Sequence, residues 1–202
     1  MNLLIAGFGG HARSVGDLAL TCGYKRLLFV DANAAPDETF LDHPAVQSFD
    51  QVDQSWQHAF AASGNGQLRE RQCKEISERL LKLVTLISPT AYIGRGAVIG
   101  PGCFIGHQAC VGALSTVGQA SIINTGATVE HESFIGDYSH VSINSCVGGR
   151  SRVGAYCMLG AGAVVIDAIS ISDRVTIGAG AAVIDSIALP GTYVGVPTRR
   201  LG

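Results

Sequence analysis

Residues 93–116 divide into four groups of six, IGRGAV, IGPGCF, IGHQAC and VGALST, each of which begins with an aliphatic residue. The pattern extends far beyond this stretch: from Ile87 to Val183 every sixth residue is Ile, Leu or Val, 17 times in succession. Glycine follows the aliphatic residue in ten of these 17 hexads, and the fifth residue of each of the first 13 is Ala, Ser or Cys. A period of six fits neither a 3.6-residue helix nor a simple alternating strand.

The repeat predicts a β-solenoid in which every hexad supplies one short strand and one corner. The aliphatic residue would fill the interior, and the small fifth residue would let the next corner approach closely. Glycine and asparagine would supply corner backbone angles that other residues resist. Three hexads would complete one coil of a triangular prism, with coils stacked about 4.8 Å apart. The 17 hexads therefore predict between five and six coils.

The composition excludes several classes of protein. Charged residues make up 15% of the chain and the formal net charge is −2, so no basic excess exists to neutralise nucleic-acid phosphates. Apolar residues make up 47%, which argues against disorder. The first residues lack the features of a secretion signal, and the six cysteines form no CxxC pair, which favours a cytoplasmic protein with reduced thiols. Residues 96–129 lack charges but contain seven glycines, so we expect no membrane insertion.

The composition changes near residue 86, because all three lysines lie before that point and 19 of the 26 glycines lie after it. We therefore expect an N-terminal α/β domain at 1–86, the solenoid at 87–188 and a C-terminal tail at 189–202. In the tail, the segment VGVPTRR at 194–200 either lies beside a bound ligand or is solvated.

Strands and helices alternate in the first 86 residues. Apolar runs and helical spacing predict strands at 2–6, 26–30 and 82–87, a short strand near 45–49, helices at 11–22 and 67–80, and either a strand or a helix at 56–62. Such alternation predicts a small parallel sheet of the Rossmann-like βαβ type.

A glycine-rich turn follows the first expected strand. Gly7, Gly9 and Ala12 have the spacing G-x-G-x-x-A, and Asp31 ends the next strand. Taken alone, the pattern is compatible with a dinucleotide site such as that for NAD. The signal is weak, because backbone N–H groups at any helix N-terminus can bind phosphate.

The regularity of the solenoid is interrupted at 129–134, VEHESF, where Glu130 replaces the usual glycine. A neutral imidazole near pH 7 suits a general base, so His131 is the candidate base and Glu132 would orient it or raise its basicity. The alternative is a solvated polar corner. Gly149 lies 18 residues after His131 and should stack on the same corner. Its N–H would then stabilise an oxyanion. Alternatively, Gly149 would only permit a tight corner.

Two further histidines lie in the solenoid. His140 follows His131 by nine residues, half a coil, which puts the two on different sides of one prism. If it has no role in the reaction, His140 would be a surface residue facing a neighbouring subunit. His107 has the hexad position of His131 but falls on a different corner. Because the three histidines lie on three sides and form no HxxxxH pair, we expect no metal site.

The order of motifs resembles that of the hexapeptide-repeat acyltransferases, which are left-handed parallel β-helices. Within them, it is similar to the bacterial nucleotide-amino-sugar N-acetyltransferases and the related sialic acid O-acetyltransferases. The resemblance covers essentially the whole chain and rests on GFGGH at 7–11, FVD at 29–31, GNGQLR at 64–69, VEHESFIGDYSHVS at 129–142 and VGVP at 194–197.

The resemblance implies a homotrimer that uses acetyl-CoA as co-substrate to acetylate an amino group, expected at the 4-position, of a nucleotide-linked sugar. It implies His131 as the base with Glu132 as its support. It places acetyl-CoA contacts at His140, Gly149, Ala161 and Ala179, and nucleotide-sugar contacts in the N-terminal domain at Gly9, Gly10, His11, Asp31, Gly64 and Asn65. Ala32 follows Asp31 where an acidic pair is possible, so the nucleotide is not identified. Two alternatives stay open: O-acetylation of a sugar hydroxyl, and a non-catalytic nucleotide-binding scaffold.

Overall fold

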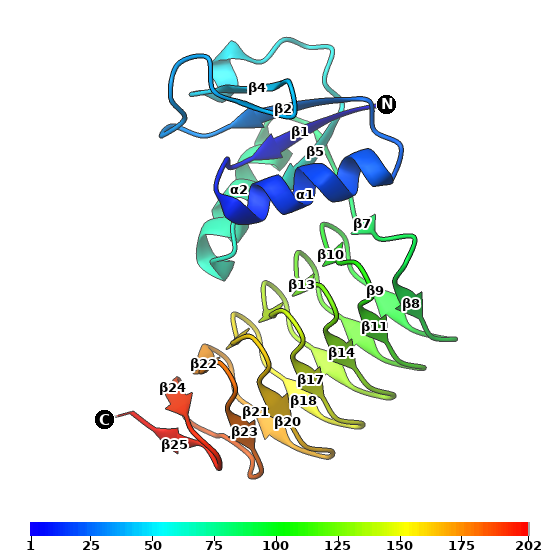
Figure 1. Ribbon diagram of the computed structural model, residues 1–202, viewed down its shortest axis with the longest axis vertical. Coiled ribbons are helices and arrows are strands. Elements are labelled where there is room, and N and C mark those ends of the chain that lie inside the picture. The colour runs from blue at the N-terminus through cyan, green and yellow to red at the C-terminus, as the bar shows by residue number, and fades with distance from the viewer. Residues whose placement is uncertain (202) are drawn as a thin grey trace. The chain divides into compact units, whose positions relative to one another are not determined.

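The computed structural model describes residues 1–201, which form two compact units (Figure 1). The first unit ends at Leu86 and the second begins at Ile87. Within residues 1–201, no helix is long and apolar enough to cross a membrane.

The first unit contains a six-stranded sheet with the strand order β3-β4-β2-β1-β5-β6 and two helices. Its elements are β1 (Asn2–Ala6), α1 (Gly10–Thr21), β2 (Arg26–Val30), β3 (Thr39–Phe40), β4 (His43–Val46), a 3-10 turn at Phe49–Gln51, β5 (His58–Ala61), α2 (Gly66–Glu78) and β6 (Lys82–Leu83). Helix α1 connects β1 to the parallel β2, and β5 pairs with the other edge of β1, also in parallel. The central strands are apolar runs such as LLIA because they are buried along their length.

The expected single strand at 82–87 is wrong. The segment forms two strands, β6 and β7 (Leu86–Ile87), which belong to different sheets. The two strands follow each other within one apolar run, and apolar periodicity alone does not mark the boundary between the two sheets. The undecided segment 56–62 contains the strand β5, and the short strand expected near 45–49 begins earlier, at His43.

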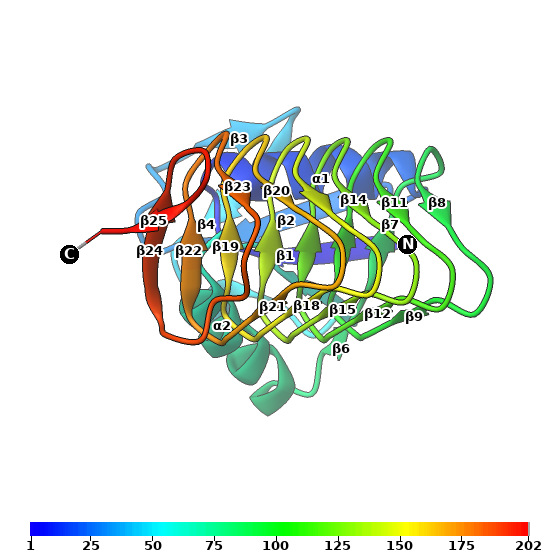
Figure 2. The same ribbon diagram turned by 90° about the horizontal axis from the view of Figure 1, so that it is seen from below.

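From β7 onward, short strands alternate with corners and stack into three sheets, which confirms the β-solenoid (Figures 1 and 2). A residue pairs in parallel with the residue 18 positions later, as Cys110 does with Thr128, so three hexads complete one coil. We call the eight-stranded, six-stranded and five-stranded sheets of the solenoid face 1, face 2 and face 3, in that order. The chain passes through them in this order in every coil.

The strands of the three faces have the following bounds. Face 1 consists of β7, β10 (Phe104–Ile105), β13 (Ile122–Ile123), β16 (His140–Val141), β19 (Met158–Leu159), β22 (Val175–Ile177), β24 (Gly191–Val194) and β25 (Arg199–Arg200). Face 2 consists of β8 (Tyr92–Ile93), β11 (Cys110–Val111), β14 (Thr128–Val129), β17 (Cys146–Val147), β20 (Val164–Val165) and β23 (Ala182–Val183). Face 3 consists of β9 (Val98–Ile99), β12 (Thr116–Val117), β15 (Phe134–Ile135), β18 (Arg152–Val153) and β21 (Ser170–Ile171).

The repeated aliphatic residues fill the interior of the prism. From Ile105 to Val183 each is at most 3% exposed. The expectation is wrong for Ile87, which is 38% exposed, and Ile93 and Ile99 are only partly buried. These three residues belong to the first coil, which has another coil on one side only.

Glycine in the second position of a hexad serves close packing and not the corner angle. A Cβ built on Gly112 would lie 2.6 Å from His131 N in the next coil, closer than real Cβ atoms come. The positive φ falls two residues later. Glycine or asparagine carries it at some corners, as at Gly126 (66°) and Asn144 (54°), and other residues carry it elsewhere, as at Tyr138 (57°). The expectation that glycine supplies corner angles is therefore wrong for the second position of the hexad.

Serine in the fifth position also bonds one coil to the next. Ser121 Oγ donates to Gly136 O at 2.8 Å and accepts from Ser139 N at 3.2 Å. The hydroxyls of Ser115, Ser133, Ser139, Ser145 and Ser151 likewise donate to the carbonyl 15 residues later. These side chains give the buried corners hydrogen-bond partners that Ala cannot provide.

Residues 189–201 do not form a separate tail. Strand β24 pairs in parallel with β22 and extends face 1, and β25 returns antiparallel to β24. The pairing of Tyr193 with Arg200 places the segment VGVPTRR at 194–200 on the last coil of the solenoid.

Candidate active site

The Glu-His-Glu corner joins β14 of face 2 to β15 of face 3. His131 Nδ1 lies 3.1 Å from Glu132 Oε2, and the two side chains are 49% and 52% exposed. When the Glu132 carboxylate accepts the proton of Nδ1, Nε2 becomes the ring nitrogen that is able to accept a proton from another molecule. Glu130 Oε2 accepts from His131 N at 3.3 Å. The corner therefore presents an oriented imidazole to solvent.

Gly149 lies beside the His131 ring in the next coil, as the 18-residue spacing predicts. A Cβ built on Gly149 would lie 2.6 Å from His131 Nε2 and 2.8 Å from Cε1. Arg150 N donates to His131 O at 2.9 Å, which holds the two corners together. The absence of a side chain at position 149 is what leaves room for the imidazole.

His140 lies in β16 and is 7% exposed, so little of its side chain is open to solvent in the single chain. Its Nε2 lies 3.1 Å from Asn124 Nδ2 in the preceding coil. Strand β16 belongs to face 1, whereas the His131 corner joins faces 2 and 3. In a three-sided prism a corner lies across from the third face, so the two histidines of one chain lie on opposite sides of the solenoid.

Ala161 and Ala179 follow β19 and β22 and stack at the corner between faces 1 and 2. The two corners approach closely: a Cβ built on Gly160, the residue before Ala161, would lie 2.5 Å from Ala179 N. Face 2 separates this corner from His131. Of the residues expected at acetyl-CoA, one chain thus brings Gly149 to His131 but leaves His140, Ala161 and Ala179 elsewhere.

His107 lies at the corner between faces 1 and 2, where its Nδ1 is 2.8 Å from Ser88 Oγ. That contact links two successive coils. In the part of the chain that the structure describes, residues 1–201, no group of three or more His, Cys, Asp or Glu side chains could hold a metal ion.

Four of the six cysteines are poorly suited to nucleophilic catalysis. Burial raises the pKa of the Cys73 and Cys157 thiols to about 11. Burial also raises the pKa of Cys110 and Cys146, helped by the nearby charge of Glu130. These four thiols are therefore protonated at neutral pH, whereas the nucleophile in cysteine catalysis is the thiolate.

The residues expected to contact the nucleotide-sugar gather at one edge of the first unit's sheet. Strands β1, β2 and β5 are adjacent and parallel, so the loops that follow them begin at the same edge. Gly9 is the N-cap of α1, and Asn65 is the N-cap of α2, with its Oδ1 accepting from Leu68 N at 3.0 Å. Two helix N-termini, which favour anions, therefore start at this edge. Gly10 and His11 lie in the first turn of α1, and Gly64 immediately precedes Asn65.

Asp31 shapes the loops at this edge. Its Oδ2 accepts from Phe8 N at 2.8 Å, and its Oδ1 accepts from Asn33 N at 2.9 Å and from Asn33 Nδ2 at 3.2 Å. The carboxylate therefore ties the loop after β1 to the loop after β2, a contribution that the sequence does not reveal.

Sequence reasoning missed three residues at this edge. Ser63 N donates to Gln72 Oε1 at 3.0 Å, and Arg69 Nη1 donates to Ser63 O at 2.6 Å. The sequence placed Arg69 and Gln72 on an amphipathic helix and gave neither a role. The available signals are the position of Arg69 at the end of the GNGQLR motif and the spacing of three residues, which puts both on one face of α2.

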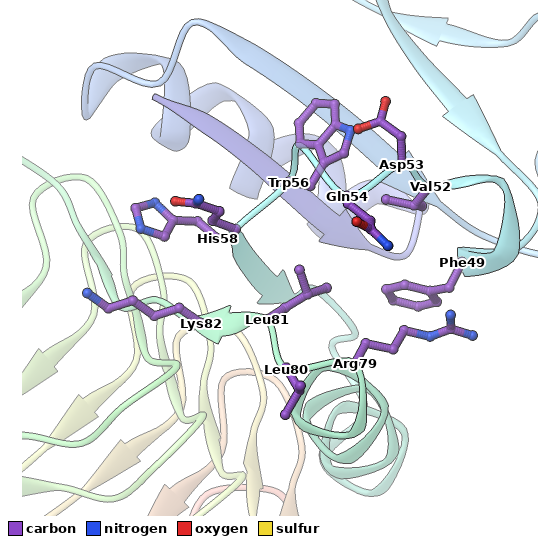
Figure 3. A pocket seen from close by; sticks show the side chains of 11 residues that line it. Phe49, Val52, Asp53, Gln54, Trp56, His58, Arg79, Leu80, Leu81 and Lys82 are labelled. Atoms are coloured by element: carbon purple, nitrogen blue, oxygen red, sulfur yellow. The ribbon is translucent and has the colours of Figure 1, made fainter.

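A pocket of about 670 Å³ lies elsewhere in the first unit (Figure 3). Phe49, Arg79 and Leu81 surround it, together with His58 and Lys82, the first residues of β5 and β6. It therefore lies at the opposite ends of the strands from the loop that carries Gly64 and Asn65. None of the site residues expected from the sequence lines this pocket.

Each part of the chain matches a protein family. Residues 2–76 match the PglD N-terminal domain, and residues 82–173 match the GMPPB C-terminal domain.

Solved structures match nearly the full length. The acetyltransferase domain of PglB from Neisseria gonorrhoeae FA1090 is 30% identical, with a TM-score of 0.90 and 99% of each chain covered. The same domain in complex with acetyl coenzyme A matches with 28% identity, a TM-score of 0.92 and coverage of 99% of this chain and 98% of that chain. A histidine-to-alanine variant of GDP-perosamine N-acetyltransferase from Caulobacter crescentus, in complex with CoA and GDP-perosamine, is 28% identical, with a TM-score of 0.93 and coverage of 100% of this chain and 97% of that chain.

Proposed function

This chain belongs to the hexapeptide-repeat nucleotide-amino-sugar N-acetyltransferases, and we propose that it transfers the acetyl group of acetyl-CoA to the amino group, at the 4-position, of a nucleotide-linked sugar. The observation that carries the proposal is the His131 imidazole, oriented by Glu132 at 3.1 Å and accommodated by Gly149. The solenoid would be the left-handed β-helix of the family, and the first unit its Rossmann-like nucleotide-sugar domain.

In the proposed reaction, the neutral amine attacks the thioester carbonyl carbon and His131 Nε2 takes the proton that the amine loses. Glu132 stabilises the imidazolium that results. The Gly149 N–H donates to the oxyanion. Collapse of the tetrahedral intermediate breaks the C–S bond, and the imidazolium returns its proton to the departing thiolate. The products are the N-acetylated sugar and CoA, with no covalent enzyme intermediate.

The nucleotide-sugar would bind at the sheet edge formed by the loops after β1, β2 and β5. Anionic phosphates are attracted to the N-termini of α1 and α2, which begin there. The proposed contacts are Gly9, Gly10, His11, Asp31, Gly64 and Asn65.

The proposed assembly is a homotrimer whose active sites lie between subunits. His140, Ala161 and Ala179 lie away from the His131 corner in one chain, so they can serve the same acetyl-CoA only if a neighbouring subunit supplies them. Closed cyclic symmetry provides three identical sites of this kind.

The test is a thiol-release assay with acetyl-CoA and a panel of UDP-, dTDP- and GDP-linked 4-amino-sugars, with the matching 4-hydroxy sugars as controls. We expect CoA release with one or more of the amines and none with the hydroxyl sugars. Release only with hydroxyl acceptors, including sialic acid, would identify an O-acetyltransferase. Absence of turnover combined with NAD binding in calorimetry would favour a non-catalytic scaffold.

A further inference from the structure

We propose that Gln72 and Arg69 are positioning residues that hold two substrate loops in their binding shape without touching the substrate. The inference rests on the proposed function, because it takes the loops after β1 and β5 to be the nucleotide-sugar site. It adds two residues of α2 to the determinants of that site.

Ser63 is held by α2 at both of its peptide groups. Gln72 Oε1 accepts from Ser63 N at 3.0 Å, and Arg69 Nη1 donates to Ser63 O at 2.6 Å. A bond to a guanidinium is charge-assisted and therefore among the stronger hydrogen bonds. The two side chains thus fix both the position and the orientation of the backbone at the start of the loop.

The constraint continues along the loop to Asn65. Ser63 Oγ accepts from Asn65 N at 3.2 Å, and Asn65 Oδ1 then caps α2 by accepting from Leu68 N at 3.0 Å. Gly64, between them, has open space where a Cβ would be. A displacement of Ser63 would therefore move the Gly64 and Asn65 groups that we assign to the substrate.

The other end of the Gln72 amide lies against the loop after β1. A Cβ built on Gly7, whose φ is +114°, would lie 3.4 Å from Gln72 Nε2. Gly7 N in turn donates to Val30 O at 2.7 Å, and the glycine-rich turn of α1 follows directly. The Gln72 amide thus lies against both the loop after β1 and the loop after β5, so its loss should disturb the two loops together.

The experiment measures binding to the full-length protein by titration calorimetry. UDP, dTDP and GDP are the probes for the nucleotide-sugar site, and CoA is the probe for the other substrate. The variants are Gln72→Met, which keeps the side-chain length but loses the acceptor, and Arg69→Met. We expect Kd for the preferred nucleotide to rise about tenfold in each, because a loop that loses one anchor spends less time in its binding shape. Kd for CoA should stay close to wild type. Tm should fall by a few degrees, because each variant leaves a backbone group of Ser63 without its side-chain partner.

Two further variants separate positioning from a general effect on folding. Arg69→Lys retains a cationic donor and should bind the nucleotide more tightly than Arg69→Met does. Arg71→Ala removes an exposed charge from the same helix and should match wild type.

The outcomes separate this inference from the proposed function. If wild type binds none of the three nucleotides, the proposed function of the first unit fails and the inference fails with it. If wild type binds a nucleotide and the two Met variants bind it equally well, only the positioning role is overturned. Equal weakening of nucleotide and CoA binding also overturns it, because that pattern indicates a general structural role.

Discussion

At the scale of single residues, His131 is the group whose loss should matter most. We expect His131→Ala to lower kcat by about 10²–10⁴, the range for a lost general base. Thiol release at saturating concentrations of both substrates measures the change. His107→Ala is the matched control, because His107 has the same hexad position but contacts Ser88 on another corner, and its kcat should be unchanged. Full activity of His131→Ala would refute the assignment.

Gly149 offers a second test at the same corner. The methyl group of Gly149→Ala would lie 2.6 Å from His131 Nε2, so the imidazole must move. Misplacing a catalytic group by about 1 Å costs up to about 100-fold in rate, so we expect kcat to fall by tenfold or more.

A double-mutant cycle shows whether Gly149 acts through the His131 ring. In the absence of the imidazole the added methyl group has nothing to displace. His131→Ala/Gly149→Ala should therefore be no slower than His131→Ala alone. Independent, additive losses would mean that Gly149 acts by another route.

At the scale of elements, the fifth-position serines should contribute to the stability of the stacked coils. Ser121→Ala removes the donor to Gly136 O and leaves the buried Ser139 N without its Ser121 acceptor. We expect the free energy of unfolding to fall by about 1–3 kcal/mol. Urea denaturation measures it. Ser170→Ala, on the exposed side of β21, is the control and should change little. An unchanged midpoint for Ser121→Ala would show that the hydroxyl serves only as a small residue.

At the scale of the whole molecule, the opposite placement of His131 and His140 predicts complementation between subunits. His131→Ala and His140→Ala should each be impaired when alone. Coexpressed in equal amounts, they should form trimers in which about one quarter of the sites combine an intact His131 with an intact His140 from the neighbour.

Differently tagged subunits allow the mixed trimers to be purified in two affinity steps. Their activity should exceed that of both parents. If mixed trimers form but show no more than the average of the two parents, the sites do not combine these histidines from different subunits. A monomer in sedimentation analysis would contradict the proposed assembly directly.

Features that repeat at a fixed spacing along the chain could be predicted from the sequence. The unbroken six-residue period determined the solenoid, the 18-residue coil and the stacking of Gly149 on His131. These features follow from spacing along one chain, because each coil repeats the geometry of the one before it. The same spacing placed His107 on a different corner from His131.

Other features depend on which segments become neighbours, and only the tertiary structure decided them. The sequence joined β6 and β7 into one strand, expected Ile87 to be buried and attached no function to Gln72 or Arg69. It named Asp31 as a substrate contact but did not show that the Asp31 carboxylate also accepts from Phe8 N, 23 residues away. Each hexad carries the residue spacing that determines the geometry of the solenoid. The sheet edge, in contrast, is formed by loops whose hydrogen bonds exist only once β1, β2 and β5 lie side by side.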